Sequence, residues 1–211
     1  MLKDFTSALF KKNKGFTLVE LMVVSGIIIF MTAFVLINYR AGGQQLALNR
    51  SAHKLAQDIR RAQEMAMSAA ICELCGDIVP PRYGIYIAEP DSNPTSYTLF
   101  ADTGNYDGLF VWTGSPLDRD QIIKEIDFES SVYLGNIEVD GCNIGDVPFD
   151  QRHSHLTFEP PDPETEIRVG FPQPPPHPPI YCTGIVLTLG VEGYSQTKTV
   201  KINNAGLIYV E

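Results

Sequence analysis

The sequence is poor in cations and in cysteine, and it has no proline before Pro80. Its 211 residues carry 16 Lys and Arg against 25 Asp and Glu, which gives a net charge of -9. A protein that coats nucleic acid needs a basic face, so this balance argues against that class. Four cysteines are too few for a disulfide-dense miniprotein. Glycine-rich phosphate loops and nucleophile elbows are absent, and no motif pairs two acids for catalysis, so we do not predict an enzyme or a cofactor.

Charge is also missing from a long stretch near the N-terminus. Between Phe16 and Ile37 the 22 residues include one ionisable side chain, Glu20. As a helix this stretch would rise roughly 33 Å, about the thickness of a bilayer core. It is longer than the apolar part of a secretory signal and no A-x-A site follows it. We therefore predict a transmembrane helix over residues 16–40.

The residues on either side of this span set its predicted orientation. The preceding segment, residues 1–15, carries four lysines and one aspartate, a charge of +3. Arg40 is the nearest cation on the other side. The positive-inside rule therefore places residues 1–15 in the cytoplasm and residues 41–211 outside it.

Glu20 needs an explanation, because a carboxylate inside a membrane span costs about 2.5–3.5 kcal/mol on insertion scales. Glu20 lies near the cytoplasmic end, where it can reach headgroup water, but the sequence around it suggests more. The heptapeptide Lys14–Glu20 reads KGFTLVE, and it resembles the processing motif of type IV prepilins and pseudopilins. The resemblance implies that a prepilin peptidase cuts between Gly15 and Phe16 and methylates the new terminus at Phe16. It also implies that Glu20 pairs with the terminal amine of a neighbouring subunit and sets the register of assembly.

The helix is predicted to continue beyond the membrane. Residues 41–70 contain an apolar stripe with alternating steps of three and four, which is typical of an amphipathic helix that packs on a sheet. Its members are Leu48, Ala52, Leu55, Ile59, Ala62, Ala66 and Ala69. Gly42-Gly43 predicts a bend or local melting just outside the membrane, since each glycine costs about 1 kcal/mol relative to alanine. We expect the helix to end near Ala70.

Residues 71–211 are predicted to form β-strands separated by turn residues. The clearest hairpin joins Lys198–Ile202 to Leu207–Val210 through Asn203-Asn204-Ala205-Gly206. A long helix followed by antiparallel strands is an α+β plan, with the helix on one sheet or on two. The expected strands are Tyr83–Ala88, Ser96–Asp102, Ile122–Phe128, Val132–Val139, Leu156–Glu159, Glu166–Phe171, Ile185–Val191, Lys198–Ile202 and Leu207–Val210. This β body carries most of the negative charge, with 7 cations and 21 anions.

The sequence of the amphipathic helix (residues 48–69), the all-β body and the closing strand-turn-strand (residues 199–210) resemble those of the GspH/FimT group of minor pseudopilins and minor pilins. This resemblance implies a non-enzymatic subunit of a type IV pilus or a type II secretion pseudopilus. Its implied partners are the prepilin peptidase, other pilin subunits, the inner-membrane assembly platform and membrane lipid. Three alternatives stay open: a DNA-binding minor pilin, a major pilin and a membrane-anchored ectodomain that does not assemble. The resemblance would imply DNA binding through an arginine-bearing C-terminal region, as in some relatives of the FimT type. Nucleic acid is not expected here, because the tail Ala205–Glu211 has no arginine.

The four cysteines form an even set outside the cytoplasm, where thiols can oxidise. Three connectivities are possible, and we favour Cys72–Cys75 together with Cys142–Cys182. A redox site is disfavoured because C-x-x-C here follows a helix end, and a zinc site because a second C-x-x-C is missing. We therefore expect structural disulfides.

Three further features have both a functional and a simpler interpretation. Asp102–Gly108 suggests a calcium loop, but its acids miss the EF-hand spacing, so a polar turn is favoured. His153 and His155 would lie on one face of a strand, yet no third metal ligand is evident. Residues 160–179 hold nine of the fifteen prolines and predict an extended polyproline loop, either a stiff connection or a docking segment.

Overall fold

The structure is a computed structural model, which describes residues 15–87, 94–104, 110, 120–142, 153–159, 165–170 and 180–211. The chain forms two compact units that divide between Gly43 and Gln44. The second unit combines the last part of the long helix with ten strands in two antiparallel sheets. The predicted α+β class is therefore confirmed, and of the two arrangements left open the structure has the one with two sheets.

The helix, α1, runs from Leu18 to Met67. Its backbone is helical through Gly42 and Gly43, so the local melting predicted there is wrong. The helix-breaking tendency of glycine is about 1 kcal/mol per residue, which flanking helix formers readily offset. Six of the seven predicted stripe residues are buried, and the exception is Ala69.

Ala69 is exposed because the helix ends earlier than predicted. Its φ is 46°, in the left-handed region. The amide of Ala69 donates to the Ala66 carbonyl and the amide of Ala70 donates to the Met65 carbonyl, both at 2.9 Å. These two bonds form a Schellman motif, in which the left-handed position is normally glycine. The chain therefore turns away from the helix axis at Ala69, and the predicted end near Ala70 is corrected to Met67.

This turn gives a stability prediction. Ala69→Gly should raise the free energy of unfolding by about 0.5–1 kcal/mol, because glycine adopts the left-handed conformation without the Cβ clash. Urea denaturation of residues 44–211, which contain the whole buried core, measures it. Ala66→Gly, inside the helix and buried, is the matched control and should destabilise. A lower midpoint for Ala69→Gly would contradict the proposed origin of the strain.

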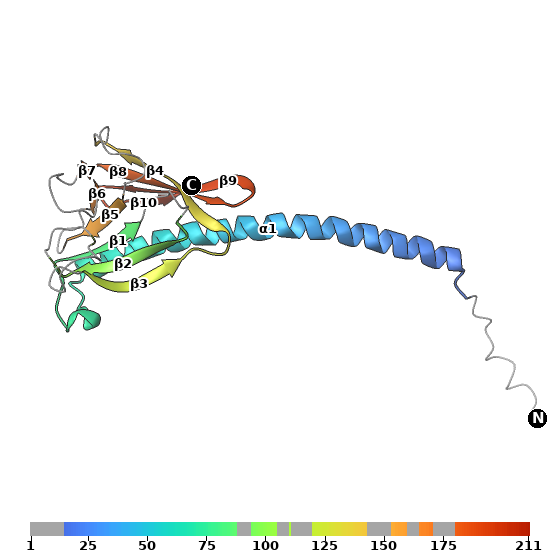
Figure 1. Cartoon of the computed structure of the whole chain (residues 1–211), viewed down its shortest axis with the longest axis horizontal. Coiled ribbons are helices and arrows are strands. Elements are labelled where there is room, and N and C mark those ends of the chain that lie inside the picture. Colours follow the sequence, from blue (N-terminus) through green and yellow to red (C-terminus); the bar gives the residue numbers. More distant parts are fainter. Residues whose placement is uncertain are drawn as a thin grey trace, which may run out of the picture. The chain divides into compact units, whose positions relative to one another are not determined.

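The strands form a six-stranded sheet, ordered β3-β2-β1-β5-β6-β7, and a four-stranded sheet, ordered β10-β9-β8-β4. In Figure 1 the strands gather along the C-terminal part of α1. The strands are β1 (Arg82–Ile87), β2 (Ser96–Asp102), β3 (Gln121–Asp127), β4 (Val132–Asp140), β5 (His153–Phe158), β6 (Thr165–Gly170), β7 (Ile180–Cys182), β8 (Gly184–Val191), β9 (Tyr194–Asn203) and β10 (Ile208–Val210).

All nine predicted strands are present; β2 has the predicted bounds, and the other eight have shifts at their ends. Strands β5 and β9 begin three and four residues earlier than predicted, at His153 and Tyr194. Strand β7 was not predicted. The hairpin between β9 and β10 is confirmed: Ile202 pairs with Ile208, and the turn places Gly206 at a φ of 75°.

One hydrophobic core joins the α1 stripe to the inner faces of both sheets. Small alanines on the helix allow the sheets to approach closely, as the stripe predicted. Two tyrosine hydroxyls on the six-stranded sheet add polar anchors. Tyr83 donates to the Ala70 carbonyl and Tyr97 to Asp58 Oδ2, both at 2.7 Å. The last turns of α1 are thus fixed to the sheet by packing and by hydrogen bonds.

Candidate functional site

The first candidate site is the start of α1. Gly15, Phe16 and Thr17 are outside the helix, and Leu18 is the first helical residue. The Phe16 side chain is 81% exposed, and a Cβ placed on Gly15 would meet no atom within 4 Å. The Gly15–Phe16 peptide bond therefore lies in accessible, non-helical backbone, which is the form in which a protease cleft accepts a substrate.

Thr17 and Glu20 cap this helix end reciprocally. The Glu20 amide donates to Thr17 Oγ1 at 3.2 Å, and the Thr17 amide donates to Glu20 Oε2 at 3.0 Å. The Thr17 hydroxyl also donates to Oε2, at 2.9 Å. This is a capping box, which satisfies two backbone donors that the helix leaves free. It holds the carboxylate at the first turn, where the helix dipole also favours negative charge.

Residues Leu18–Leu36 form a helix long and apolar enough to cross a membrane, with a mean hydropathy of 2.4. All nineteen side chains are exposed. A helix that is apolar and exposed over this length needs lipid or other helices as its surroundings. Glu20 is the acid in its first turn.

Comparison with known proteins bears on this segment. Residues 10–36 match the family described as "Prokaryotic N-terminal methylation motif". This match agrees with the prepilin-type motif expected around Gly15 and Phe16. Among solved structures, the chain is similar to the minor pseudopilin EpsH from the type 2 secretion system of Vibrio cholerae, with 13% identity and a TM-score of 0.39. That similarity covers 78% of this chain and 94% of EpsH. No curated protein matches the chain.

The structure joins the four cysteines in the favoured pairs, Cys72–Cys75 and Cys142–Cys182. The first pair closes a short loop around a single 3-10 turn, η1 (Glu73–Cys75), just beyond α1. The second pair joins the chain just after β4 to the last residue of β7, and so links the two sheets. Both bridges stabilise the domain covalently, which agrees with the structural role expected for the cysteines.

The two histidines of β5 lie together on the outer face of the six-stranded sheet, and both rings contact Tyr86. His153 Nδ1 is 2.6 Å from the Tyr86 hydroxyl, and His155 Nδ1 accepts the Phe110 amide at 2.9 Å. Both rings are thus held by hydrogen bonds. Within the described parts of the chain, no three His, Cys, Asp or Glu side chains are grouped so that they could hold a metal ion.

The calcium loop and the polyproline loop lie largely outside the described residues. Of Asp102–Gly108, the structure describes residues 102–104. Asp102 is buried and its Oδ2 lies 3.7 Å from Arg82 Nη1. For the proline-rich segment, residues 160–164 and 171–179 lie outside the described part, and residues 165–170 form β6.

The sequence did not reveal a cluster of charges on this same outer face. Arg82 on β1 lies 2.8 Å from Glu159 and 3.7 Å from Glu166, and Glu166 also pairs with Arg168 on β6. The Arg168 guanidinium lies 4.8 Å from the centre of the Tyr181 ring. These residues come from β1, β6, β7 and the position just after β5, so only the register brings them together. The alternation in Glu166-Ile167-Arg168, polar around apolar, was the one signal that the two charges share a face.

His155 gives a pH prediction. Burial, followed by the charges of His153 and Arg168, lowers the pKa of His155 to about 3. Its unfolded pKa is about 6.5. Because the unfolded chain binds the proton first, stability is fully present above pH 6.5 and decreases as the pH falls toward 3.

Between pH 6.5 and 4.5, protonation of this one group should remove about 2 kcal/mol from the free energy of unfolding. The variant His155→Asn retains an acceptor for the Phe110 amide and does not titrate, so its stability should fall less steeply. Urea denaturation of residues 44–211 at several pH values compares the two slopes, and the absolute stability of the variant does not enter the comparison. Parallel slopes would show that the pKa of His155 is the same in the folded and unfolded states, and would contradict the prediction.

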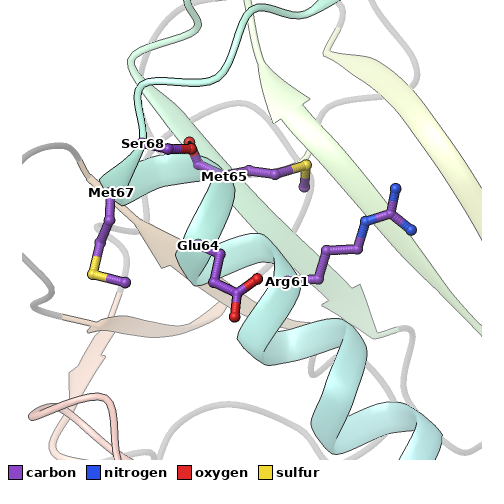
Figure 2. Close-up of a pocket in the computed structure, with 5 residues that line it drawn as sticks. All are labelled: Arg61, Glu64, Met65, Met67 and Ser68. Atoms are coloured by element: carbon purple, nitrogen blue, oxygen red, sulfur yellow. The ribbon is translucent and has the colours of Figure 1, made fainter.

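One open hollow lies at the end of α1, lined by Arg61, Glu64, Met65, Met67 and Ser68. Figure 2 shows the Met65 and Met67 side chains directed to opposite sides of the helix, with Glu64 between them. The hollow is lined by one cation, one anion, one hydroxyl and two thioethers, and none of these side chains is a nucleophile paired with a base. The hollow therefore resembles a contact surface more than a catalytic centre.

Proposed function

We propose that this chain is a minor pilin-like subunit that is processed at Gly15–Phe16 and assembled into a type IV pilus or a type II secretion pseudopilus. The observation that carries the proposal is the arrangement at the start of α1. An accessible glycine–phenylalanine bond directly precedes an apolar helix whose first turn contains Glu20. This combination serves both membrane anchoring and proteolytic release from a basic leader. The match of residues 10–36 to the methylation motif supports it independently.

In this proposal the leader, residues 1–15, lies in the cytoplasm and the β body lies outside the inner membrane. The lysine-rich leader supports that orientation, and the two disulfides suit an oxidising compartment. Phe16 is the methylated terminus and Glu20 pairs with the terminal amine of a neighbouring subunit. The assembly platform and membrane lipid are further partners. A GspH/FimT-type position at or near the filament tip is the finer part of the proposal, supported by the two-sheet body and its closing hairpin.

The processing step can be tested at Gly15. Gly15→Val should leave the chain unprocessed, because a branched side chain at the cut site would fill the narrow cleft that glycine enters. The effect should not arise from misfolding, since a Cβ at Gly15 meets no atom within 4 Å. Mass spectrometry of the membrane-bound chain reads out the result.

For the unaltered chain, the expected mass is that of residues 16–211 with one methyl group on Phe16. The matched control is a valine at Gly26, inside the apolar helix, where a Cβ also meets no atom within 4 Å; Gly26→Val should be processed normally. A full-length, unmethylated chain in cells that contain an active prepilin peptidase would contradict the proposal.

A further inference from the structure

A short loop after α1 carries an unusual amount of exposed apolar surface. The loop, residues 70–79, is held by the Cys72–Cys75 disulfide and by the Cys72 amide, which donates to the Ile78 carbonyl at 2.8 Å. Asp77 has a φ of 59° and donates its amide to the Cys72 carbonyl at 3.1 Å. We call residues 70–79 the stapled loop. Its backbone is fixed by covalent and hydrogen bonds, so the positions of its side chains are set in advance.

Four side chains of the stapled loop are apolar and exposed, and Met67 adds a fifth at the end of α1. Their exposed fractions are Met67 47%, Ile71 62%, Leu74 62%, Ile78 44% and Val79 49%. Single exposed apolar residues are ordinary, but a cluster on a rigid segment marks an interaction surface. Such a segment loses little conformational entropy on binding, which favours a contact.

The charges near this surface restrict its partner. Residues 62–81 contain Glu64, Glu73 and Asp77 and no lysine or arginine. The cation beside Met67 is Arg61, which lines the same hollow as Glu64. An anionic membrane surface or a nucleic acid would be repelled, since both are bound through cations. The partner that fits is a protein surface that combines an apolar side chain with positive charge.

The chain itself presents such a surface at the other end of the same helical segment. Leu46 is 48% exposed, and Arg50, four residues later, lies on the same helix face and is exposed. His53 continues this face and is also exposed. We call Leu46, Arg50 and His53 the basic face. Around it, residues 41–70 carry four cations and two anions.

We propose that the stapled loop of one subunit docks on the basic face of a second copy of this chain. Leu46 of the second copy contacts the apolar cluster, and its Arg50 lies beside Glu73 and Asp77. The inference rests on the proposed function, which it deepens by naming one contact of the assembled subunit.

The positions of the two surfaces determine what such a contact builds. Seventeen residues of α1 separate Arg50 from Met67, or about 25 Å along the helix axis. A contact between two different surfaces of a subunit is heterologous, so it closes no two-fold dimer and builds an open helical filament or a ring. Repetition in one direction is what a filament requires.

The test uses the full chain in its own membrane, in two copies with different tags, one of which carries a photo-crosslinking phenylalanine derivative in place of Leu74. We expect an adduct that joins the two tags and maps to the tryptic peptides 41–50 or 51–54 of the second copy. The same probe at Tyr209, which is 52% exposed on β10, is the matched control and should not label those peptides. Membrane and sheared filament fractions are scored separately.

A charge exchange makes the test specific. Glu73→Arg in the probe copy should lower the adduct yield about threefold to fivefold, and Arg50→Glu in the second copy should do the same. The two changes together should restore the yield. Both side chains are exposed, so neither change should unfold the domain.

Labelling of another protein only, of lipid, or of a different region of the second copy would overturn the contact. So would the lack of any adduct when the chain does reach the filament fraction. A chain that never reaches the filament fraction would overturn the proposed function instead. The two failures are therefore distinguishable.

Discussion

Replacement of Glu20 with alanine is expected to lower the amount of this chain in sheared filaments by about a hundredfold or more. In the proposed assembly, the Glu20 carboxylate neutralises the terminal amine of a neighbouring Phe16 inside an apolar helix bundle. Removing one partner of a buried ion pair costs about 3–5 kcal/mol, because the other charge remains buried and unpaired. Each 1.4 kcal/mol is a factor of ten in an equilibrium constant, so incorporation should be nearly abolished.

The same substitution should have the opposite effect on membrane anchoring. Removal of the acid from the first turn of the span Leu18–Leu36 favours insertion, by less than the roughly 2.5–3.5 kcal/mol of a charge at the centre of a span. The amount of chain in the membrane fraction should therefore stay normal or rise while the filament fraction loses it. Immunoblots of the two fractions measure both quantities in one experiment and separate an assembly defect from a loss of expression.

Two matched variants separate charge from capping. In the unaltered chain the Thr17 amide and hydroxyl donate to Glu20 Oε2. Glu20→Gln retains an oxygen for these two donors but has no charge. Its incorporation into filaments should therefore be as low as that of the alanine variant. Thr17→Ala removes the cap and leaves the acid, and the loss of a cap costs only about 1 kcal/mol. Its defect should be tenfold or smaller. If Glu20→Gln assembled normally, the ion pair would have no part in register.

The parts of the fold that could be predicted from the sequence are those set by local periodicity. The alternation of three and four along Leu48–Ala66 places six buried residues correctly, since any helix of that sequence must have one apolar side. Strand β2 occupies the predicted residues, Ser96–Asp102. The capping box at the start of α1 was not predicted, although Thr17 and Glu20 have its spacing.

The errors fall where tertiary contacts override local preference. The first half of β9, Tyr194–Thr197, is polar and gave no signal, yet it pairs with the end of β8 through Gly190–Thr197 and Val191–Tyr194. Strand β7 has only three residues, and its pairing with β6 defines it. The early end of α1 depends on Ala69 in a left-handed conformation, which no propensity scale favours for alanine. The charges around Arg82 were hidden for a related reason, since they meet only through strand register.

Removal of a disulfide is the second change with a large expected effect on the free energy of unfolding. The number of residues in the loop that each disulfide closes predicts the size of this effect. Cys142 and Cys182 are 40 residues apart, whereas Cys72 and Cys75 are three apart. On the chain-entropy estimate, the long loop contributes about 4 kcal/mol to the free energy of unfolding and the short loop about 2 kcal/mol. The long bridge also joins the end of β7 in one sheet to the chain after β4 in the other, and it acts beside the bond from the Thr183 amide to the Asp140 carbonyl at 2.8 Å.

The double variant Cys142→Ala/Cys182→Ala should therefore be destabilised about twice as much as Cys72→Ala/Cys75→Ala. Urea denaturation of residues 44–211 without reductant compares the two variants, and the unaltered domain in reductant serves as a third measurement. Each pair includes one buried cysteine, Cys72 or Cys182, so each double variant leaves a cavity and the expected ranking rests on loop length. If the short-loop variant proves the less stable, loop closure does not set the ranking, and the two sheets hold together without their covalent link.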